Sequence, residues 1–261
     1  MIVRTEAVTL RTFRYGETSL IASLFTRYAG RISVLARGAR GPKSRFGATL
    51  QPMSYVEALY SYKATRSLQT LREASHVVRF PALSTDLSRL TPGLRMVELV
   101  SALTEEGEPN VAIFNLLTES LQGANAAPDR PENALFYFEM RLAELLGFAP
   151  QFTKADVQSV GDDGGTLGFD SGLIQSYESS GIAERGVTYG AGRQRIASRR
   201  VLRSFAVASR ASLRDVLRMQ ITDDDARALG LLIEDYLRYH VEDAYPSRSD
   251  DVRSALRVGV G

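Results

Sequence analysis

The spacing of apolar residues changes at Phe80-Pro81, and this change divides the chain into two parts. Before residue 80, apolar and polar residues alternate over short runs, which is the period of a β-strand. After Pro81, apolar residues recur about every 3.6 positions, which is typical of amphipathic helices. One architecture cannot serve both patterns, so we expect an α+β chain with a β domain over 1–80, a mainly helical domain over 81–246 and a tail over 247–261.

The first part contains five short strand-like runs with glycine turns near residues 16 and 30. The runs span residues 3–10, 19–26, 31–37, 55–60 and 68–73. Five strands within about 75 residues favour a closed OB-type barrel, because an open sheet would leave unpaired edges. The aromatic residues expected to fill the barrel or pack between its strands are Phe13, Phe25, Tyr55 and Tyr60.

Charge is strongly segregated between the two parts. Residues 1–80 carry 13 Lys and Arg against 4 acids, a net charge of +9, whereas the remainder carries 19 against 26, a net charge of −7. A basic module joined to an acidic one is typical of a nucleic-acid-binding domain fused to a second unit.

The basic charge is densest in residues 36–47, ARGARGPKSRFG. This stretch holds Arg37, Arg40, Lys43 and Arg45 without any acid, and its glycines and proline prevent regular structure. A loop of this composition on the rim of a barrel is suited to contact a polyanion.

Aromatic residues are interleaved with the cations of the first part, and rings can stack on unpaired bases. The candidate DNA-binding residues are Arg14, Tyr15, Arg37, Arg40, Lys43, Arg45, Phe46, Tyr62, Lys63 and Arg66. The alternative is a solvated basic surface whose rings fill the barrel.

In the second part we expect a helix that begins at Thr91-Pro92, one capped by Asn110 and one that begins near Asp129. Later helices are expected over 209–217 and 222–240. Glycines punctuate residues 151–200, which we expect to form an irregular or hairpin-containing insertion.

A second cationic run spans Arg185 to Arg218. It would either extend the polyanion-binding surface onto the helical domain or form an exposed face. The acids of 222–240 could neutralise it internally, and both interpretations remain open.

Signals for catalysis are weak. The chain has no cysteine, no phosphate-binding glycine loop and only two histidines, His76 and His240, far apart in the sequence. The adjacent acids Asp162-Asp163 and 223–225 do not converge as metal ligands do, so capping or solvation explains them better than a nuclease site. We therefore expect no enzymatic activity, no cofactor and no metal. The absence of a long apolar run predicts a cytoplasmic, nucleoid-associated protein without a membrane partner.

Several segments resemble the bacterial RecO family of recombination mediators. They are LRTFRYGETSLI (10–21), LFTRYAGRISVLARGARGPKSRFGATLQPMSYVEALY (24–60), RSLQTLREA (66–74) and EMRLAELLGFAP (139–150). The resemblance implies an N-terminal OB fold that binds single- and double-stranded DNA, and a helical domain that contacts RecR and the C-terminal tail of single-strand-binding protein. It also implies the annealing of complementary strands and, within the RecF pathway, the loading of RecA, with RecF and RecA as further partners.

The chain departs from the family at one point. Many members carry two CxxC pairs after this last segment, whereas the comparable residues here, 154–157 and 175–178, contain no sulfur. A structural zinc is therefore not expected. The insertion would instead be held by apolar contacts among Leu167, Phe169, Leu173, Ile174 and Tyr177, or else be loose.

The leading hypothesis is a non-enzymatic DNA-binding mediator of recombination and DNA repair. The alternative from a different class is an OB-fold RNA-binding or ribosome-associated module, which would require the 2′-hydroxyl of its ligand.

Overall fold

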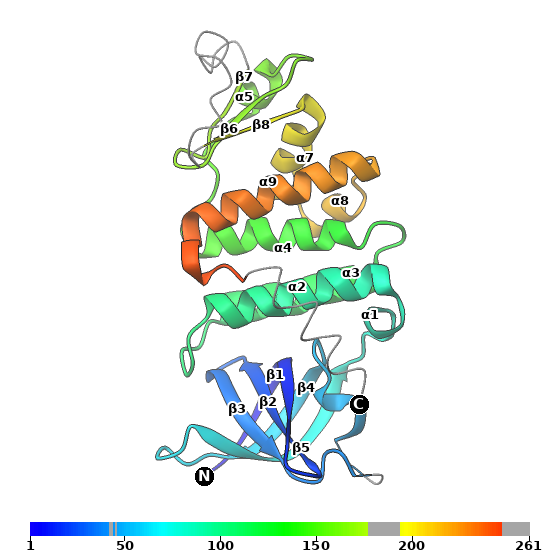
Figure 1. The fold of residues 1–261 in the computed structure, drawn as a ribbon, viewed down its shortest axis with the longest axis vertical. Coiled ribbons are helices and arrows are strands. Elements are labelled where there is room, and N and C mark those ends of the chain that lie inside the picture. Colours follow the sequence, from blue (N-terminus) through cyan, green and yellow to red (C-terminus); the bar gives the residue numbers. More distant parts are fainter. Residues whose placement is uncertain (42–43, 45, 177–193, 247–261) are drawn as a thin grey trace.

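The fold is stacked along one long axis, as Figure 1 shows: a barrel lies at one end, helices follow, and a small sheet lies at the other end. The structure is a computed structural model, and it describes residues 1–41, 44, 46–176 and 194–246. The tail expected over 247–261 lies outside the described residues. Among the described helices, none is both long and apolar enough to cross a membrane.

The barrel confirms the expected OB-type architecture. Its strands are β1 (Ile2–Tyr15), β2 (Ser19–Thr26), β3 (Gly30–Ala36), β4 (Tyr55–Ser61) and β5 (Leu68–Val78), with a short 3-10 helix, η1 (Gly47–Leu50), between β3 and β4. The strands close in the order β1-β2-β3-β5-β4, and only β3 and β5 pair in parallel. Alternate residues point inward, so mostly small and branched side chains fill the interior.

The helical part begins directly after the barrel. It contains α1 (Pro81–Thr85), α2 (Leu87–Leu103), α3 (Val111–Ala126), α4 (Glu132–Leu145), α7 (Arg199–Arg210), α8 (Leu213–Leu217) and α9 (Asp223–Val241), followed by the 3-10 turn η3 (Glu242–Ala244). Helices α2 and α3 lie next to the barrel, α4 packs against both, and α7 and α9 pack on α4.

Two expected helix positions are wrong. Helix α2 begins at Leu87, because the Asp86 side chain accepts a hydrogen bond from the Ser88 N–H and caps the helix, so Pro92 lies inside it rather than at its start. The helix expected over 209–217 is two helices, since Ser198 caps α7 and Ser212 caps α8. The predicted cap Asn110 is confirmed at the start of α3.

The insertion over 151–200 is more regular than expected. It forms α5 (Lys154–Ser159) and a three-stranded antiparallel sheet of β6 (Gly165–Gly168), β7 (Ile174–Ser176) and β8 (Gln194–Ala197), in the order β7-β6-β8. Leu167, Phe169 and Ile174 are buried as predicted. The prediction for Leu173 is wrong, because this residue precedes β7 and its side chain is exposed, while its neighbour Ile174 is buried. Tyr177 lies outside the described residues.

One hydrophobic core joins the barrel to the helices. Val8, Phe25 and Met53 of the barrel belong to the same buried cluster as the apolar residues of α2, α3, α4 and α9. The ring of Phe114 on α3 lies 6.1 Å from the ring of Phe25 and 5.9 Å from that of Tyr55. These contacts confirm the packing role expected for Phe25 and Tyr55. One end of the barrel is therefore closed by helices, and only the other end is free.

Candidate nucleic-acid interface

Three connections lie at the end of the barrel away from the helices (Figure 1), and we call their described residues, 16–18, 37–41, 44, 46 and 62–67, the loop end. The strand register brings the first two connections side by side, because Tyr15 pairs with Ser19 and Leu20 with Ala36. The third closes the β4–β5 hairpin, where Ser61 pairs with Thr70 and, on β1, with Ile2 at the start of that strand. The opposite end, which we call the helix end, consists of residues 27–29 and 51–54 and faces α2 and α3. In OB folds the face of β2 and β3 and the loops after β1 and β4 commonly bind oligonucleotides.

Cations at the loop end are exposed and lack counter-ions. Arg14, Arg37, Lys63 and Arg66 are all exposed, and none forms an ion pair with any residue that the structure describes. Elsewhere on the barrel, Arg4 pairs with Glu57 and Arg27 pairs with Glu6, each at 2.8 Å. The loop end therefore concentrates positive charge that the protein itself leaves uncompensated.

Arg40 is exposed in the loop after β3, and it also braces that loop. Its guanidinium donates hydrogen bonds to the carbonyl oxygens of Gly16 and Glu17, at 3.4 and 3.1 Å, and its backbone N–H donates to the Thr18 carbonyl at 2.9 Å. Arg40 thus ties the loop after β3 to the turn between β1 and β2. Its charge still lies at the loop end, but part of its hydrogen-bonding capacity holds the two loops together.

The side chain of Gln69, which is 5% exposed, holds the loop between β4 and β5 by hydrogen bonds to its backbone. The Gln69 side chain accepts from the Lys63 N–H at 2.8 Å and donates to the carbonyl oxygens of Lys63 and Arg66. These bonds satisfy the backbone of a tight loop and fix its shape. The side chains of Tyr62, Lys63 and Arg66 are left exposed on a rigid backbone.

Two exposed rings and one arginine lie on the outer face of β1. Phe13 and Tyr15 are 51% and 52% exposed, and the guanidinium of Arg11 lies 5.2 Å from the centre of the Phe13 ring. The register places Phe13 beside Ile21 of β2, which in turn pairs with Leu35 of β3. We call Arg11, Phe13 and Tyr15 the β1 platform.

The expectation that Phe13 lies in the core is wrong, and a β-bulge is the reason. The pairing of β1 with β2 shifts between Thr9 and Arg11, so one extra residue, Leu10, enters the strand. Before the bulge Ala7 points into the barrel, and after it Thr12, opposite the buried Ala22, does so. Because a shift of one residue reverses the faces of a strand, Phe13 turns outward.

Phe46, a predicted DNA-binding residue, is not available to a base. Its side chain is 2% exposed and belongs to the core of the barrel. Tyr62, by contrast, is 41% exposed at the loop end. The two remaining candidates, Lys43 and Arg45, lie outside the described residues.

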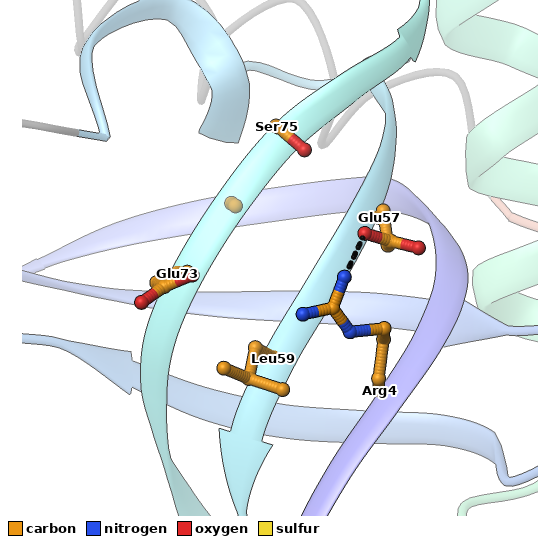
Figure 2. Close-up of a pocket in the computed structure, with 6 residues that line it drawn as sticks. Arg4, Glu57, Leu59, Glu73 and Ser75 are labelled. Carbon is orange, nitrogen blue, oxygen red and sulfur yellow. Dashed lines mark hydrogen bonds and ion pairs between the residues drawn. The ribbon is translucent and has the colours of Figure 1, made fainter.

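A shallow depression of about 230 Å³ lies on another wall of the barrel, where β1, β4 and β5 meet (Figure 2). It is lined by Arg4, Glu57, Leu59, Glu73, Ala74 and Ser75, and the ion pair of Arg4 with Glu57 crosses it. Two carboxylates in so small a space repel phosphate, so this depression does not extend the basic surface.

The residues considered for metal or acid chemistry are dispersed. Asp162 pairs with Arg199, Asp223 with Arg130 and Asp224 with Arg227. Within the described ranges no group of three or more His, Cys, Asp or Glu side chains could hold a metal ion. The residues at the positions of the family's zinc motifs do not fit zinc: 154–157 lie on α5, and Gln175 and Ser176 lie on β7, without a thiol or imidazole.

The two histidines are packed as single imidazoles. His240 stacks on Phe148, with ring centres 4.6 Å apart, and burial lowers its pKa against the effect of the hydrogen bond that the imidazole donates to the backbone of Phe169. Burial, helped by the charge of Arg79, likewise lowers the pKa of His76. Both sets of surroundings favour the neutral form of the imidazole.

Comparison with known families gives two matches that together span nearly the whole chain. Residues 1–80 match the family described as Recombination protein O N terminal, and residues 84–249 match Recombination protein O C terminal.

Individual relatives agree with these matches. A protein named DNA repair protein RecO from Salinibacter ruber is 43% identical over 251 residues, which cover 96% of this chain and 93% of that protein. Proteins of the same name from Chloroherpeton thalassium and Bacillus subtilis are 28% identical over 264 residues and 35% identical over 151 residues. The first covers 98% of this chain and 99% of that protein, and the second covers 58% of each.

Proposed function

Because this chain belongs to the RecO family of DNA repair proteins, we propose that it acts in repair and recombination by binding DNA at the loop end of its barrel. The observation that carries the proposal is a set of exposed cations that pair with no described acid: Arg14 and Arg37 near the β1 platform, and Lys63 and Arg66 in the loop that also exposes Tyr62. Cations neutralise phosphates and release counter-ions, and rings stack on bases.

The cations and the rings differ in the form of DNA that they bind. The cations attract the phosphates of single-stranded and double-stranded DNA alike. The rings of Phe13 and Tyr15 need unstacked bases, so they favour a single strand by about 1–3 kcal/mol for each base that stacks. Bonds from Arg40 and Gln69 fix the loops that carry the cations, which reduces the entropy lost on binding.

We propose, on the basis of family membership, that the protein anneals complementary strands and helps to load RecA onto single strands coated by single-strand-binding protein. Bound cations reduce the repulsion between two phosphate backbones, which is the physical basis for annealing. The proposed protein partners are RecR, the C-terminal tail of single-strand-binding protein, RecF and RecA. The role is non-enzymatic and is carried out in the cytoplasm on DNA.

The proposal is tested by the salt dependence of binding to a single-stranded oligonucleotide. In the combined variant Arg37→Gln, Lys63→Gln and Arg66→Gln, we expect the slope of log affinity against log salt to decrease by about 2, since each phosphate contact on a single strand contributes about 0.7. Arg4→Gln is the control, because Arg4 is already paired with Glu57 on the same barrel. An unchanged affinity and slope in the combined variant would refute the assignment.

Two further measurements distinguish the alternatives. A ribonucleotide oligomer of the same sequence and length is expected to bind no more tightly than its DNA counterpart; a clear preference for RNA would favour an RNA-binding module instead. Pull-downs with RecR and with the tail peptide of single-strand-binding protein test the proposed partners.

A further inference from the structure

The arginines of the helical part fall into two groups. Most of them form ion pairs: Arg89, Arg95, Arg130, Arg141, Arg195, Arg199, Arg227 and Arg238. Over the described part of 81–246, the arginines without an ion pair are Arg200, Arg203, Arg210, Arg214 and Arg218. All five lie on α7, α8 and the residue after α8, and we call them the α7–α8 patch.

Unpaired charge here is not due to a shortage of acids, because residues 81–261 carry an excess of seven acids over bases. Between residues 199 and 218 the one acid is Asp215, and its carboxylate accepts a hydrogen bond from Ser212 at the start of α8. Like charges three residues apart, such as Arg200 and Arg203, slightly destabilise a helix. The patch therefore keeps a repulsion that the acids of this part of the chain do not relieve.

The shape of the helix explains how the patch is displayed. Val201, Leu202, Phe205 and Ala208 are at most 3% exposed and point into the core, so the opposite side of α7 faces solvent. Exposed Arg200 and Arg203 lie one turn apart on that side, and exposed Arg210 lies at its end. The α7–α8 patch is thus the polar face of a strongly amphipathic helix and its continuation.

The corner between α7 and α8 is held rigidly. The guanidinium of Arg141 on α4 donates to the carbonyl oxygens of Ser209 and Ala211, both at 2.9 Å, and it pairs with Glu144. Arg210 donates to the carbonyl of Phe152 and lies 4.7 Å from the centre of its ring. These contacts hold the side chain of Arg210 and the backbone between α7 and α8 in place, so binding there loses less entropy.

We propose that the α7–α8 patch binds the phosphate backbone of a second DNA strand. Ten residues of α7 separate Arg200 from Arg210, a length of about 15 Å. This length spans roughly four phosphates of a strand at about 3.4 Å per nucleotide. The α7–α8 segment offers Val207 as its exposed large apolar side chain and no exposed ring among the described residues, which suits backbone binding without base stacking.

The α7–α8 patch and the loop end are separate sites. Two helix layers, α2 with α3 and then α4, lie between the barrel and α7, and α8 packs against α3 and α4 (Figure 1). Packed helices are about 8–10 Å apart, so these two layers separate the sites by roughly 20 Å or more. One chain can therefore hold two strands at once. This inference rests on the proposed function of the loop end and adds a second strand to it.

The experiment counts strands per chain. Two labelled, non-complementary single-stranded oligonucleotides are mixed with the full chain; native mass spectrometry reports complexes of one chain with two strands, and energy transfer reports bridging. We expect Arg203→Glu and Arg214→Glu, separately and together, to retain the complex with one strand and to lose most of the complex with two. Strand annealing should fall several-fold in parallel.

The matched control is Arg227→Glu, which makes the same charge change on an exposed arginine that is already paired with Asp224. It should leave two-strand binding intact, and thermal unfolding should show that all variants fold. If a variant unfolds, Arg203→Gln replaces it.

Unchanged two-strand complexes in the double variant would overturn the patch while leaving the loop-end proposal in place. If the double variant lost binding to a glutamate-rich peptide but kept binding to the second DNA strand, the α7–α8 patch would be a site for a protein partner and the proposal would be overturned. A wild-type chain that binds no DNA at all would instead overturn the proposed function, and with it this inference.

Discussion

The two ends of the barrel are built from the same five strands but treat charge and aromatic rings in opposite ways. At the loop end, Arg14, Arg37, Lys63 and Arg66 form no ion pair with a described residue, and the rings of Phe13 and Tyr15 are about half exposed. At the helix end, Arg27 is paired with Glu6, and Phe25 is fully buried against Phe114. The difference shows that composition alone does not locate a binding surface, because both ends are rich in arginine and aromatics. The cover that α2 and α3 give to the helix end does distinguish them.

The largest expected effect tests the two phenylalanines against each other. Phe25→Ala removes a fully buried ring and should lower the free energy of unfolding by about 3–5 kcal/mol. Phe13→Ala removes an exposed ring and should change it by no more than about 0.5 kcal/mol. Urea denaturation of the two variants measures both values. Similar losses of stability in the two variants would contradict the assignment of the β1 platform to the surface.

Substitution of one glycine at each end of the barrel tests how closely the helices pack on the helix end. Gly16 at the loop end and Gly30 at the helix end both have a left-handed backbone, with φ of 60° and 64°. Ala at Gly16 meets open space and should cost about 1 kcal/mol for the conformation alone. A methyl group at Gly30 would overlap the backbone of Glu108, so Gly30→Ala should cost at least about 1 kcal/mol more. Equal unfolding midpoints for the two variants would show that the helix end is loosely docked.

The β1 platform can be probed by fluorescence, because the natural chain contains no tryptophan. In Phe13→Trp we expect quenching by single-stranded DNA and little change with duplex. Tyr28→Trp, at the helix end and 69% exposed, is the control and should respond to neither. Phe13→Ala should weaken single-strand binding by about 1–3 kcal/mol. Retained DNA binding without quenching at position 13 would remove the rings from the interface and leave the cations.

The smallest effect concerns the network at the helix end. The Tyr55 hydroxyl donates to the Glu6 carboxylate at 2.7 Å and, with Arg27, lowers the pKa of Glu6 despite its partial burial. Tyr55→Phe should cost about 1 kcal/mol, since Arg27 still pairs with the carboxylate. Chemical denaturation at neutral pH measures this cost.

The same network makes stability depend on pH. The contribution of Glu6 is fully present above the pKa of an unfolded glutamate, about 4.3, and is lost as pH falls through the lower folded value. Burial and the hydrogen bond to Glu6 raise the pKa of Tyr55 from 10.0 to about 12, so its contribution is lost as pH rises through that range. Glu6→Gln should lose less stability than the natural chain on acidification. A parallel fall in both proteins would exclude Glu6 as the source.

Much of the fold could be predicted from local pattern, and the failures have physical causes. The strand alternation predicted the barrel, and Asn110 predicted the start of α3, because both signals are local. Pro92 was misleading, since the cap supplied by Asp86 moved the start of α2. Helix α7 lies within the second cationic run, and its arginines occupy its exposed side. The apolar spacing of Val201, Leu202 and Phe205 is the sequence signal that indicates this helix.

The candidate site was only partly predictable. Arg14, Arg37, Lys63 and Arg66 could be chosen from charge and loop position, and all four are exposed, in or beside the connections of the loop end. The burial of Phe46 and the exposure of Phe13 depend on the face that each side chain takes in a closed barrel. No sequence signal marks the bulge at Leu10, because it is set by pairing with a strand that follows it in the chain. The bracing contacts of Arg40 likewise arise only when two loops meet.

The bulge at Leu10 makes the length of β1 as important as its chemistry. Before the bulge, the side of β1 that faces away from the barrel interior packs against the helices, as Val8 does. After the bulge, the same side presents Arg11 and Phe13 to solvent. Deleting a single residue between them would turn the aromatic ring inward and aim the side chain of Arg14 outward without altering the composition of the strand. Insertions and deletions here should therefore be far less tolerated than conservative substitutions, and a barrel transplanted into another protein must keep this count intact.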